Sequence, residues 1–374
     1  MSADSPRPLR AAAATLDSNA RGRDNNFNLV RFLAASLVLV SHSWPLTATP
    51  GEPLERFAGF SLGHLGVDVF FVVSGFLVTG SLVARDTLTD FARARALRIF
   101  PALIASAIGT TFVLGPLVTT LPLTRYLAAW DTWRFALQNS VTWPLGVRWW
   151  LPGVYLGNPG GPTVNGALWS LPWELTMYVL LAFLGSTFLR ARGPANVARL
   201  RLVVLAGAAT AALGHGVNEA FALSSRFEVV QGLRLTALFF TAGALQLMRE
   251  RVSLRAPLFA GAVVALGVAL RFGGAWHALY PLALGYVVLW LALVPAGRVR
   301  LYNRIGDYSY GFYLWQFPIQ QAVMLRRPEA SPLELMAMAA PVSLVLAALS
   351  WHLVEFPALA LKRRSTGTRS ESRA

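Results

Sequence analysis

Four sets of ionisable side chains lie in or beside apolar stretches, where a charge usually faces a partner or a wet cavity. They are His42, Asp68, Glu174 and the pair Arg95 and Arg98. An imidazole is well suited to take a proton from a hydroxyl near neutral pH, which makes His42 a candidate general base. Glu174 could orient that imidazole or accept the proton itself. We therefore predict catalytic roles for His42 and Glu174.

The arginine pair has a spacing that suits an anion. Arg95 and Arg98 are three residues apart, so they share one face of a helix. Two guanidinium forks placed in this way match the oxygens of a phosphate. Pro101 fits the first turn of a membrane helix, whose free N–H groups and dipole would also favour an anion. The alternative is an ordinary cytoplasmic arginine cluster.

The other polar residues have structural alternatives too. His42 could be an interfacial histidine bonded to a neighbouring helix, and Glu174 a carboxylate that favours the dipole of a helix start. Asp68 could pair with Arg31 or with a backbone amide. Ser170 could cap the fourth membrane helix. We keep Asp68 and Ser170 as supporting residues.

Ten apolar stretches must position these groups, and each has roughly the ~17–25 residues that cross ~30 Å of hydrocarbon. A mean hydropathy of +0.50 with 14% charged residues is typical of a membrane protein rather than a soluble domain. We therefore predict an all-α, polytopic membrane protein with about ten transmembrane helices. The predicted spans are 28–44, 64–84, 97–121, 169–190, 199–216, 233–249, 257–273, 275–295, 307–327 and 333–360.

The basic residues predict the orientation of these spans. With the N-terminus in the cytoplasm, most of the 33 lysines and arginines fall in cytoplasmic segments, as the positive-inside rule expects. Both termini are then cytoplasmic. His42, Asp68 and Glu174 lie in the outer half of the bilayer, whereas Arg95 and Arg98 mark its cytoplasmic end. The sequence thus predicts a site that reaches across the membrane.

Composition excludes several other classes of site. The net charge of +15 is spread over six cytoplasmic segments, which indicates topology and attraction to anionic lipid rather than nucleic-acid binding. The chain has no cysteine, so it has no thiol nucleophile, disulfide or cysteine metal site. We predict no metal.

The organisation along the chain is simple. Residues 1–25 are predicted to form a disordered cytoplasmic arm without the apolar middle of a signal peptide, 26–361 one integral-membrane domain, and 362–374 a basic cytoplasmic tail. The longest connection is the outer segment 122–168. Its tryptophans are typical of interface anchors, although a loop of this length could also roof a site.

At these residues the chain resembles the acyltransferase 3 family of integral-membrane acyltransferases. The resemblance runs in order from about residue 26 to 360. Each matching motif is weak alone, but six in the right order are specific. They are residues 28–35 leading to His42, Gly66 to Phe71 with Ser74 to Leu77, Arg95-x-x-Arg98-Ile99-x-Pro101, Leu168-Trp169-Ser170-Leu171-x-x-Glu174, Gly306-x-x-Ser309-Tyr310-x-x-Tyr313-Leu314-Trp315, and Val354-Glu355-x-Pro357.

The resemblance implies a multi-pass protein of the cell (inner) membrane that transfers an acyl group from acyl-CoA, commonly acetyl-CoA, to a carbohydrate hydroxyl. Acceptors in the family include envelope polysaccharides, their lipid-linked precursors and glycosylated small molecules, so partners in envelope biosynthesis are implied. It implies that His42, Arg95 and Arg98 carry the function, with Glu174 second and Glu355 as support.

Two positions depart from the family pattern. Gln316 follows Tyr-Leu-Trp where histidine is common, and an amide cannot titrate. Phe32 stands where glycine is common, which hints at different packing near Arg31. The rival class is a transporter or flippase for a glycan or lipid-linked sugar, but no repeated halves are visible and the charges lie away from the midplane.

Overall fold

The computed structural model describes residues 15–20, 24–85, 87–188 and 193–361. Within these ranges the chain is helical almost throughout. The isolated bridges Thr15–Ser253 and Thr119–Val154 are the only β pairing in the described parts of the chain. The prediction of an all-α fold is confirmed.

One long helix corresponds to each predicted span. The long helices are α2 (Phe27–Leu46), α4 (Leu62–Ala84), α5 (Leu88–Gly109), α9 (Leu171–Phe188), α10 (Pro194–Phe221), α11 (Phe227–Leu247), α12 (Ala256–Phe272), α13 (Tyr280–Leu293), α14 (Ser309–Arg326) and α15 (Pro332–Ser350). Shorter elements are α1 (Leu16–Asn19), α3 (Pro53–Ala58), α6 (Gly115–Val118), α7 (Leu123–Ala128), α8 (Trp130–Val141), the 3-10 helices η2 (Gly166–Ser170), η3 (Gly274–Ala278) and η4 (Gly297–Arg304), and the π-helices η1 (Thr110–Leu114) and η5 (Trp351–Glu355).

Seven of the described segments are long and apolar enough to cross a bilayer: Phe27–Leu46, Leu62–Ala84, Leu88–Val118, Gly166–Phe188, Pro194–Phe221, Trp276–Leu293 and Pro332–Leu361. The other three predicted spans form α11, α12 and α14. Helix α12 has only 17 residues, whereas α11 and α14 contain buried polar side chains such as Arg234 and Gln320. The chain is a polytopic membrane protein; the count of ten spans and the side of each terminus stay predictions.

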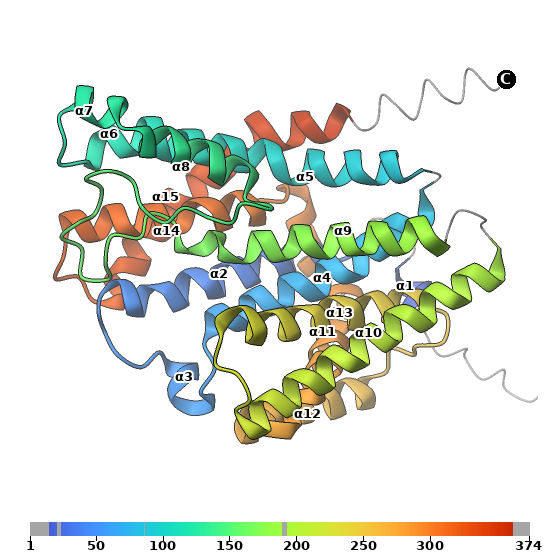
Figure 1. Cartoon of the computed structure of the whole chain (residues 1–374). Helices are drawn as coiled ribbons and strands as arrows, with labels where there is room; N and C mark the ends of the chain where they lie inside the picture. Colours follow the sequence, from blue (N-terminus) through green and yellow to red (C-terminus); the bar gives the residue numbers. More distant parts are fainter. Residues whose placement is uncertain (1–14, 21–23, 86, 189–192, 362–374) are drawn as a thin grey trace, which may run out of the picture.

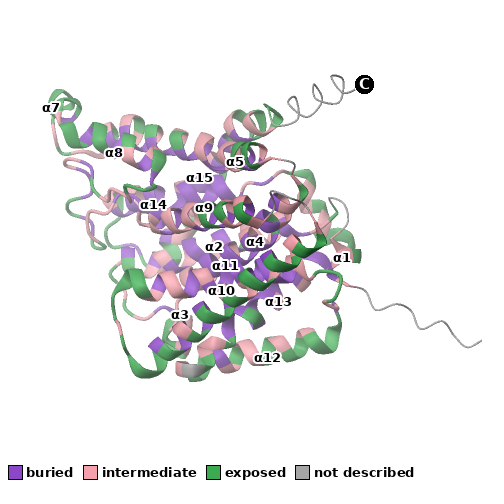
Figure 2. Cartoon of the chain, turned by 45° about the vertical axis from the view of Figure 1, so that its right-hand side comes forward, coloured by how far each residue is buried: buried purple, intermediate pink, exposed green. Residues whose placement is uncertain are grey.

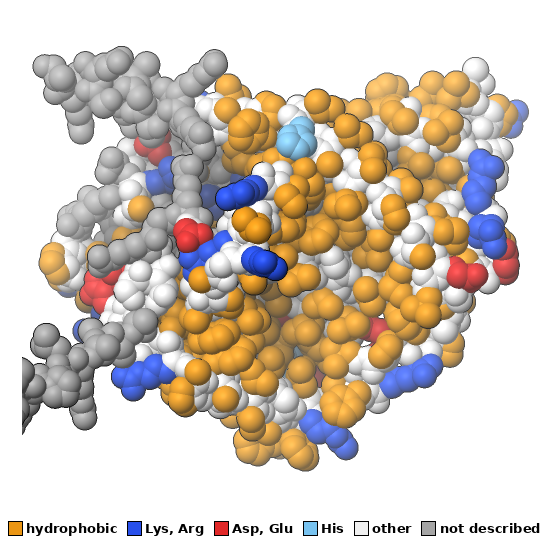
Figure 3. All heavy atoms as spheres, turned by 180° about the vertical axis from the view of Figure 1, so that it is seen from behind, with side chains coloured by type: hydrophobic (Ala, Val, Ile, Leu, Met, Phe, Trp, Pro, Cys, Tyr) orange, Lys and Arg blue, Asp and Glu red, His pale blue; other side chains and the backbone are white. Residues whose placement is uncertain are grey.

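The long helices run side by side along one axis (Figure 1). Buried residues gather along α2, α4, α11 and α14 at the centre of the bundle, and α10 and α12 lie at its edge (Figure 2). Many large apolar side chains point outward, including Leu117, Phe183 and Val264, which are each at least 66% exposed. Figure 3 shows a broad apolar face on the side of the molecule opposite to Figure 1, with arginines mostly towards its margins. Such a face requires hydrocarbon rather than water around it.

Two glycines of α4 let the central helices approach closely. A Cβ at Gly66 would meet the carbonyl oxygen of Ala34 on α2, and one at Gly75 would meet the backbone of Phe239 on α11. Helix α4 is therefore fixed between α2 and α11, with its remaining face free to line cavities.

The third predicted span begins earlier than expected. Helix α5 begins at Leu88, where the Thr87 hydroxyl accepts a hydrogen bond from the Asp90 amide at 3.1 Å. Arg95 consequently lies about 10 Å from the first residue of the helix, at about 1.5 Å per residue. Pro101 is in the helix interior, so the proposed contribution of a helix N-terminus to anion binding is wrong. The predicted span omits the first turns of α5 because their sequence is polar.

Part of the predicted disordered arm is structured. The short helix α1 packs with Leu16 fully buried, and Asp17 forms an ion pair with Arg249 at 2.9 Å. Residues 1–14, 21–23 and the whole predicted tail 362–374 lie outside the described residues.

Candidate functional site

Two cavities lie along the same group of helices, α2, α4 and the η2–α9 segment. The first, which we call the histidine cavity, has a volume of about 430 Å³. Its polar and aromatic lining comprises Ser41, His42, Trp44, Thr49, Glu52, Glu55, Ser61, His64 and Trp169. The predicted outer segment 122–168 does not roof it, because none of its residues lines this cavity. That loop instead bonds to α14, for example from the Tyr155 hydroxyl to the Pro318 carbonyl at 3.0 Å.

His42 lies on α2 in the wall of this cavity. Its ring meets Phe317 of α14 edge-on, with the ring centroids 5.0 Å apart. The buried Nδ1 atom has no hydrogen-bond partner in the described part of the chain. The imidazole is therefore oriented by packing, and its Nδ1 atom is left unpaired.

Glu52 is a buried carboxylate of this cavity that the sequence analysis did not select. It accepts hydrogen bonds from the Ser41 hydroxyl at 2.9 Å and the Leu62 amide at 2.6 Å. Burial raises its pKa, and these two hydrogen bonds act in the opposite direction. Glu52 lies in the short connection between the first two spans, and His64 lies in the first turn of the second span, α4. Only the folded arrangement shows that this connection turns back onto His42.

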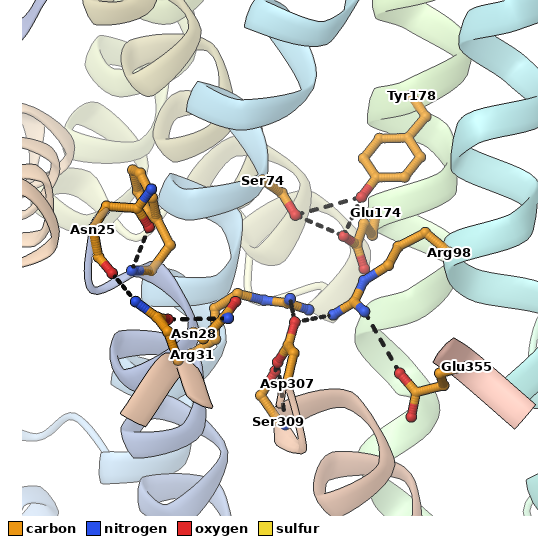
Figure 4. Close-up of polar contacts among 12 residues, drawn as sticks. Asn25, Asn28, Arg31, Ser74, Arg98, Glu174, Tyr178, Asp307, Ser309 and Glu355 are labelled. Atoms are coloured by element: carbon orange, nitrogen blue, oxygen red, sulfur yellow. Dashed lines mark hydrogen bonds and ion pairs between the residues drawn. The ribbon is translucent and has the colours of Figure 1, made fainter. Parts of the chain in front are cut away.

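The second cavity, which we call the arginine cavity, has a volume of about 220 Å³. Its polar lining comprises Arg31, Ser74, Arg95, Arg98, Glu174, Tyr178, Asp307 and Tyr310. Asp307 precedes α14 and pairs with both Arg31 and Arg98, each at 2.5 Å (Figure 4). Arg98 also lies 3.6 Å from Glu355, which accepts a hydrogen bond from Ser350. Within this cavity Arg31 and Arg98 are thus held by carboxylates.

Arg95 differs from Arg98 although both line the arginine cavity. Its Nε atom is buried without a hydrogen-bond partner, and among the described residues no carboxylate pairs with its guanidinium. The arginine motif thus contains one neutralised cation and one available cation. An anionic group such as a phosphate fits the available one.

Glu174 does not lie next to His42. Its carboxylate accepts hydrogen bonds from Ser74 at 2.7 Å and Tyr178 at 2.5 Å, and it lines the arginine cavity (Figure 4). The prediction that Glu174 orients the imidazole is wrong, because α9 begins level with the histidine cavity and carries Glu174 inward along its axis.

Asp68 and Ser170 also have partners other than those expected. Asp68 accepts hydrogen bonds from Arg234 at 3.0 Å and Tyr280 at 2.7 Å, so it pairs with neither Arg31 nor His42. Ser170 is the last residue of η2, whose first turn is capped by Asn165. Its hydroxyl shares a hydrogen bond of 2.7 Å with Tyr313 of α14 instead of capping a helix.

Gln316, which departs from the family pattern, is fully buried on α14. Neither amide atom of its side chain has a hydrogen-bond partner within the residues that the structure describes. Buried amides are normally paired, so this position has unused donor and acceptor capacity inside the bundle.

The distance between the two cavities is shorter than the membrane-wide separation that the sequence predicts for the two ends of the site. Arg31 and His42 are eleven residues apart on α2, which corresponds to about 16 Å at about 1.5 Å per residue. On α4, Val67 lines the histidine cavity and Ser74 lines the arginine cavity. Phe70 lies between them on the same helix face and packs edge-on against Tyr313, with 5.5 Å between the ring centroids.

Similarity to known proteins decides which chemistry this arrangement performs. The family model of the acyltransferase 3 type, described as an acyltransferase domain, matches residues 24–352. The chain belongs to the acyltransferase 3 family. It is therefore an enzyme that takes an acyl group from a donor, rather than a transporter.

Two relatives of this family member are informative. An O-acetyl transferase of Shigella phage Sf6 is 28% identical over 351 residues, which cover 89% of this chain and 95% of the relative. Nodulation protein 10 of Rhizobium leguminosarum bv. viciae is 35% identical over 173 residues, which cover 45% of this chain and 46% of the relative. No solved structure matches the chain.

Proposed function

We propose that this protein is an O-acyltransferase of the inner membrane that moves an acetyl group from cytoplasmic acetyl-CoA to a hydroxyl of a carbohydrate. The observation that carries the proposal is the pair of cavities on shared helices, one with an available arginine and one with a free imidazole nitrogen. The phage relative, named as an O-acetyl transferase, supports the acetyl group. The acceptor is a sugar of an envelope or exported polysaccharide, of a lipid-linked precursor or of a glycosylated small molecule.

The donor binds through its phosphates at the arginine cavity. Arg95 makes the direct contact, because its guanidinium has no carboxylate partner among the described residues. Arg98 and Arg31 are held by Asp307 and mainly fix the wall of the cavity. The phosphates remain near the cytoplasmic end, and the flexible pantetheine arm extends along α4.

The thioester reaches the histidine cavity by passing Phe70. A separation of about 10 Å between Val67 and Ser74, at about 1.5 Å per residue, is short for a pantetheine arm. This distance favours direct delivery of the acyl group to the vicinity of His42.

His42 then acts as the general base. It takes the proton of the acceptor hydroxyl, the hydroxyl oxygen attacks the thioester carbonyl, and the thiolate of CoA leaves and takes the proton from the imidazole. In the alternative route His42 attacks the thioester itself and forms an acyl-histidine, which the sugar hydroxyl then cleaves. Both routes use the free imidazole nitrogen and end with an ester and CoA.

The test is acetyl transfer by the purified protein to a panel of methyl glycosides. Wild type should form acetylated glycoside and free CoA, because both substrates are then present. His42→Ala should lower turnover about 10²–10⁴-fold, the usual contribution of a general base, while acetyl-CoA binding is retained. Near-normal turnover of a folded His42→Ala protein would contradict the role of this residue.

A further inference from the structure

A third cavity lies beside the histidine cavity, and His64 lines both. It has a volume of about 170 Å³ and is formed by the end of α10, the start of α11, the η3 turn and the segment after α3. The residues that matter for its chemistry are Phe60, His64, His215, Glu219, Arg234 and His277.

Three side chains that line this cavity each have a buried polar atom without a hydrogen bond in the described part of the chain. The atoms are Nδ1 of His215, Nε of Arg234 and Nδ1 of His277, which has only the distant Glu219 carboxylate at 3.9 Å. His215 is 4% exposed and Arg234 is 3% exposed, so neither side chain is solvated from outside. Unpaired buried donors and acceptors are rare in folded proteins, and three in one cavity indicate a polar ligand.

The walls of the cavity are fixed before any ligand binds. Arg234 is held by Asp68 at 3.0 Å and lies over the ring of Phe60 at 5.5 Å from its centroid. The rings of His215 and His277 stack with 5.4 Å between their centroids, and His277 Nδ1 lies 3.9 Å from the Glu219 carboxylate. Flat rings with polar edges suit a ligand that carries hydroxyl groups around an apolar ring face.

A proton relay does not account for this cluster. In the proposed transfer the proton lost by the acceptor hydroxyl ends on the CoA thiol. No net proton therefore has to leave the histidine cavity. The reaction does not require a chain of imidazoles that carries protons away from His42.

The position of His64 indicates which ligand is bound. Its Nδ1 atom is tied to the Ser61 hydroxyl at 2.9 Å, which fixes the ring between the two cavities. Resting on the proposed function, we propose that the third cavity binds a second sugar unit of the carbohydrate acceptor, next to the unit that is acetylated at His42. The enzyme then selects an acceptor of at least two sugar units.

The test compares acetyl transfer to methyl glycosides of one sugar with transfer to the corresponding disaccharide glycosides, screened over glucose, galactose, mannose and rhamnose. Wild type should show a KM about tenfold lower for its preferred disaccharide, as one or two extra hydrogen bonds would give. His215→Ala and His277→Ala should raise the KM for the disaccharide to that for the single sugar, with kcat and the single-sugar KM unchanged. His352→Ala, at the fifth histidine, which lines none of these three cavities, is the matched control.

The outcomes separate the two proposals. If wild type acetylates single sugars and disaccharides with equal KM and the histidine variants alter neither, the second-sugar site is wrong although the carbohydrate activity stands. If wild type acetylates none of the glycosides, the carbohydrate acceptor itself is contradicted, and the second-sugar site with it. Binding can also be measured without turnover. A rise in the Tm of wild type on addition of the disaccharide, absent from His215→Ala, would support the second-sugar site.

Discussion

At the scale of single residues, Arg95 and Arg98 are one helical turn apart and have opposite surroundings. Arg98 is neutralised by Asp307 and Glu355, whereas Arg95 faces the same cavity with its Nε unpaired in the described part of the chain. Their spacing was readable from the sequence. Their difference was not, because Asp307 is more than 200 residues away and its position depends on where α14 packs.

We predict that the two arginines respond differently to removal. Arg95→Ala should raise the KM for acetyl-CoA at least about tenfold and leave the Tm near that of wild type, because the lost contact is with the donor. Arg98→Ala should lower the free energy of unfolding by about 3 kcal/mol, because it leaves the buried Glu355 without a cation and Asp307 with Arg31 as its one remaining arginine partner. Donor kinetics and thermal melts of both variants check this, and equal effects on KM and Tm in the two would contradict it.

The residues chosen from sequence were partly placed as expected. His42 lines one cavity and Arg95 and Arg98 line the other. Glu174 and Asp68 were assigned to the wrong partners, since apolar periodicity shows how deep a residue lies in the membrane but not which helix it faces. Glu52, His64 and Asp307 were missed because they lie in short connections or at helix ends that carry no hydropathy signal.

At the scale of elements, helix α4 joins the two cavities through one face. Val67, Phe70 and Ser74 are spaced by one turn, and Phe70 packs against Tyr313 between the cavities. The spacing was visible in the sequence. The sequence did not show which face of α4 lines the cavities. The structure shows it, because Gly66 and Gly75 bring α2 and α11 against the other faces of this helix.

We predict that enlarging Phe70 obstructs the path of the acyl group. Phe70→Trp should reduce acetyl transfer at least about tenfold with the Kd for acetyl-CoA unchanged, because overpacking acts between the two cavities and not at the phosphates. Transfer rates together with donor binding by calorimetry check this. Phe183→Trp, on the exposed surface of α9, is the control and should be neutral. A Phe70→Trp enzyme with normal transfer would show that the acyl group takes another route.

At the scale of the whole molecule, the hydropathy pattern predicted the helical, polytopic architecture and the approximate place of each long helix, although α5 begins at Leu88 rather than at the predicted residue 97. It could not predict that α11 and α14 form part of the polar centre. Arg234 and Gln320 are buried there because they bond to Asp68 and to the Leu39 carbonyl, which are distant in sequence. The side chain of Gln316 is buried there without a hydrogen bond to the described residues. Seven described segments meet the length and apolarity of a span, so the remaining three need a direct test.

We predict that the loop after α8 faces outward and η4 faces the cytoplasm. The chain has no cysteine, so single cysteines at exposed Leu145 and Leu301 can be labelled without background. A membrane-impermeant maleimide should label Leu145→Cys in intact cells and Leu301→Cys only after lysis, as the distribution of arginines requires. Labelling of the two positions in the opposite order would reverse the orientation.

The most direct test of the central claim uses inside-out membrane vesicles, in which the cytoplasmic face is outward. Radiolabelled acetyl-CoA is added outside, a methyl disaccharide glycoside is enclosed in the lumen, and the side on which labelled ester forms is measured. Transfer from the arginine cavity to the histidine cavity predicts labelled disaccharide inside the vesicles, lost in His42→Ala and reduced in Arg95→Ala. Labelled ester that forms only from acceptor outside the vesicles would contradict the account, because donor and acceptor would then meet on the same face.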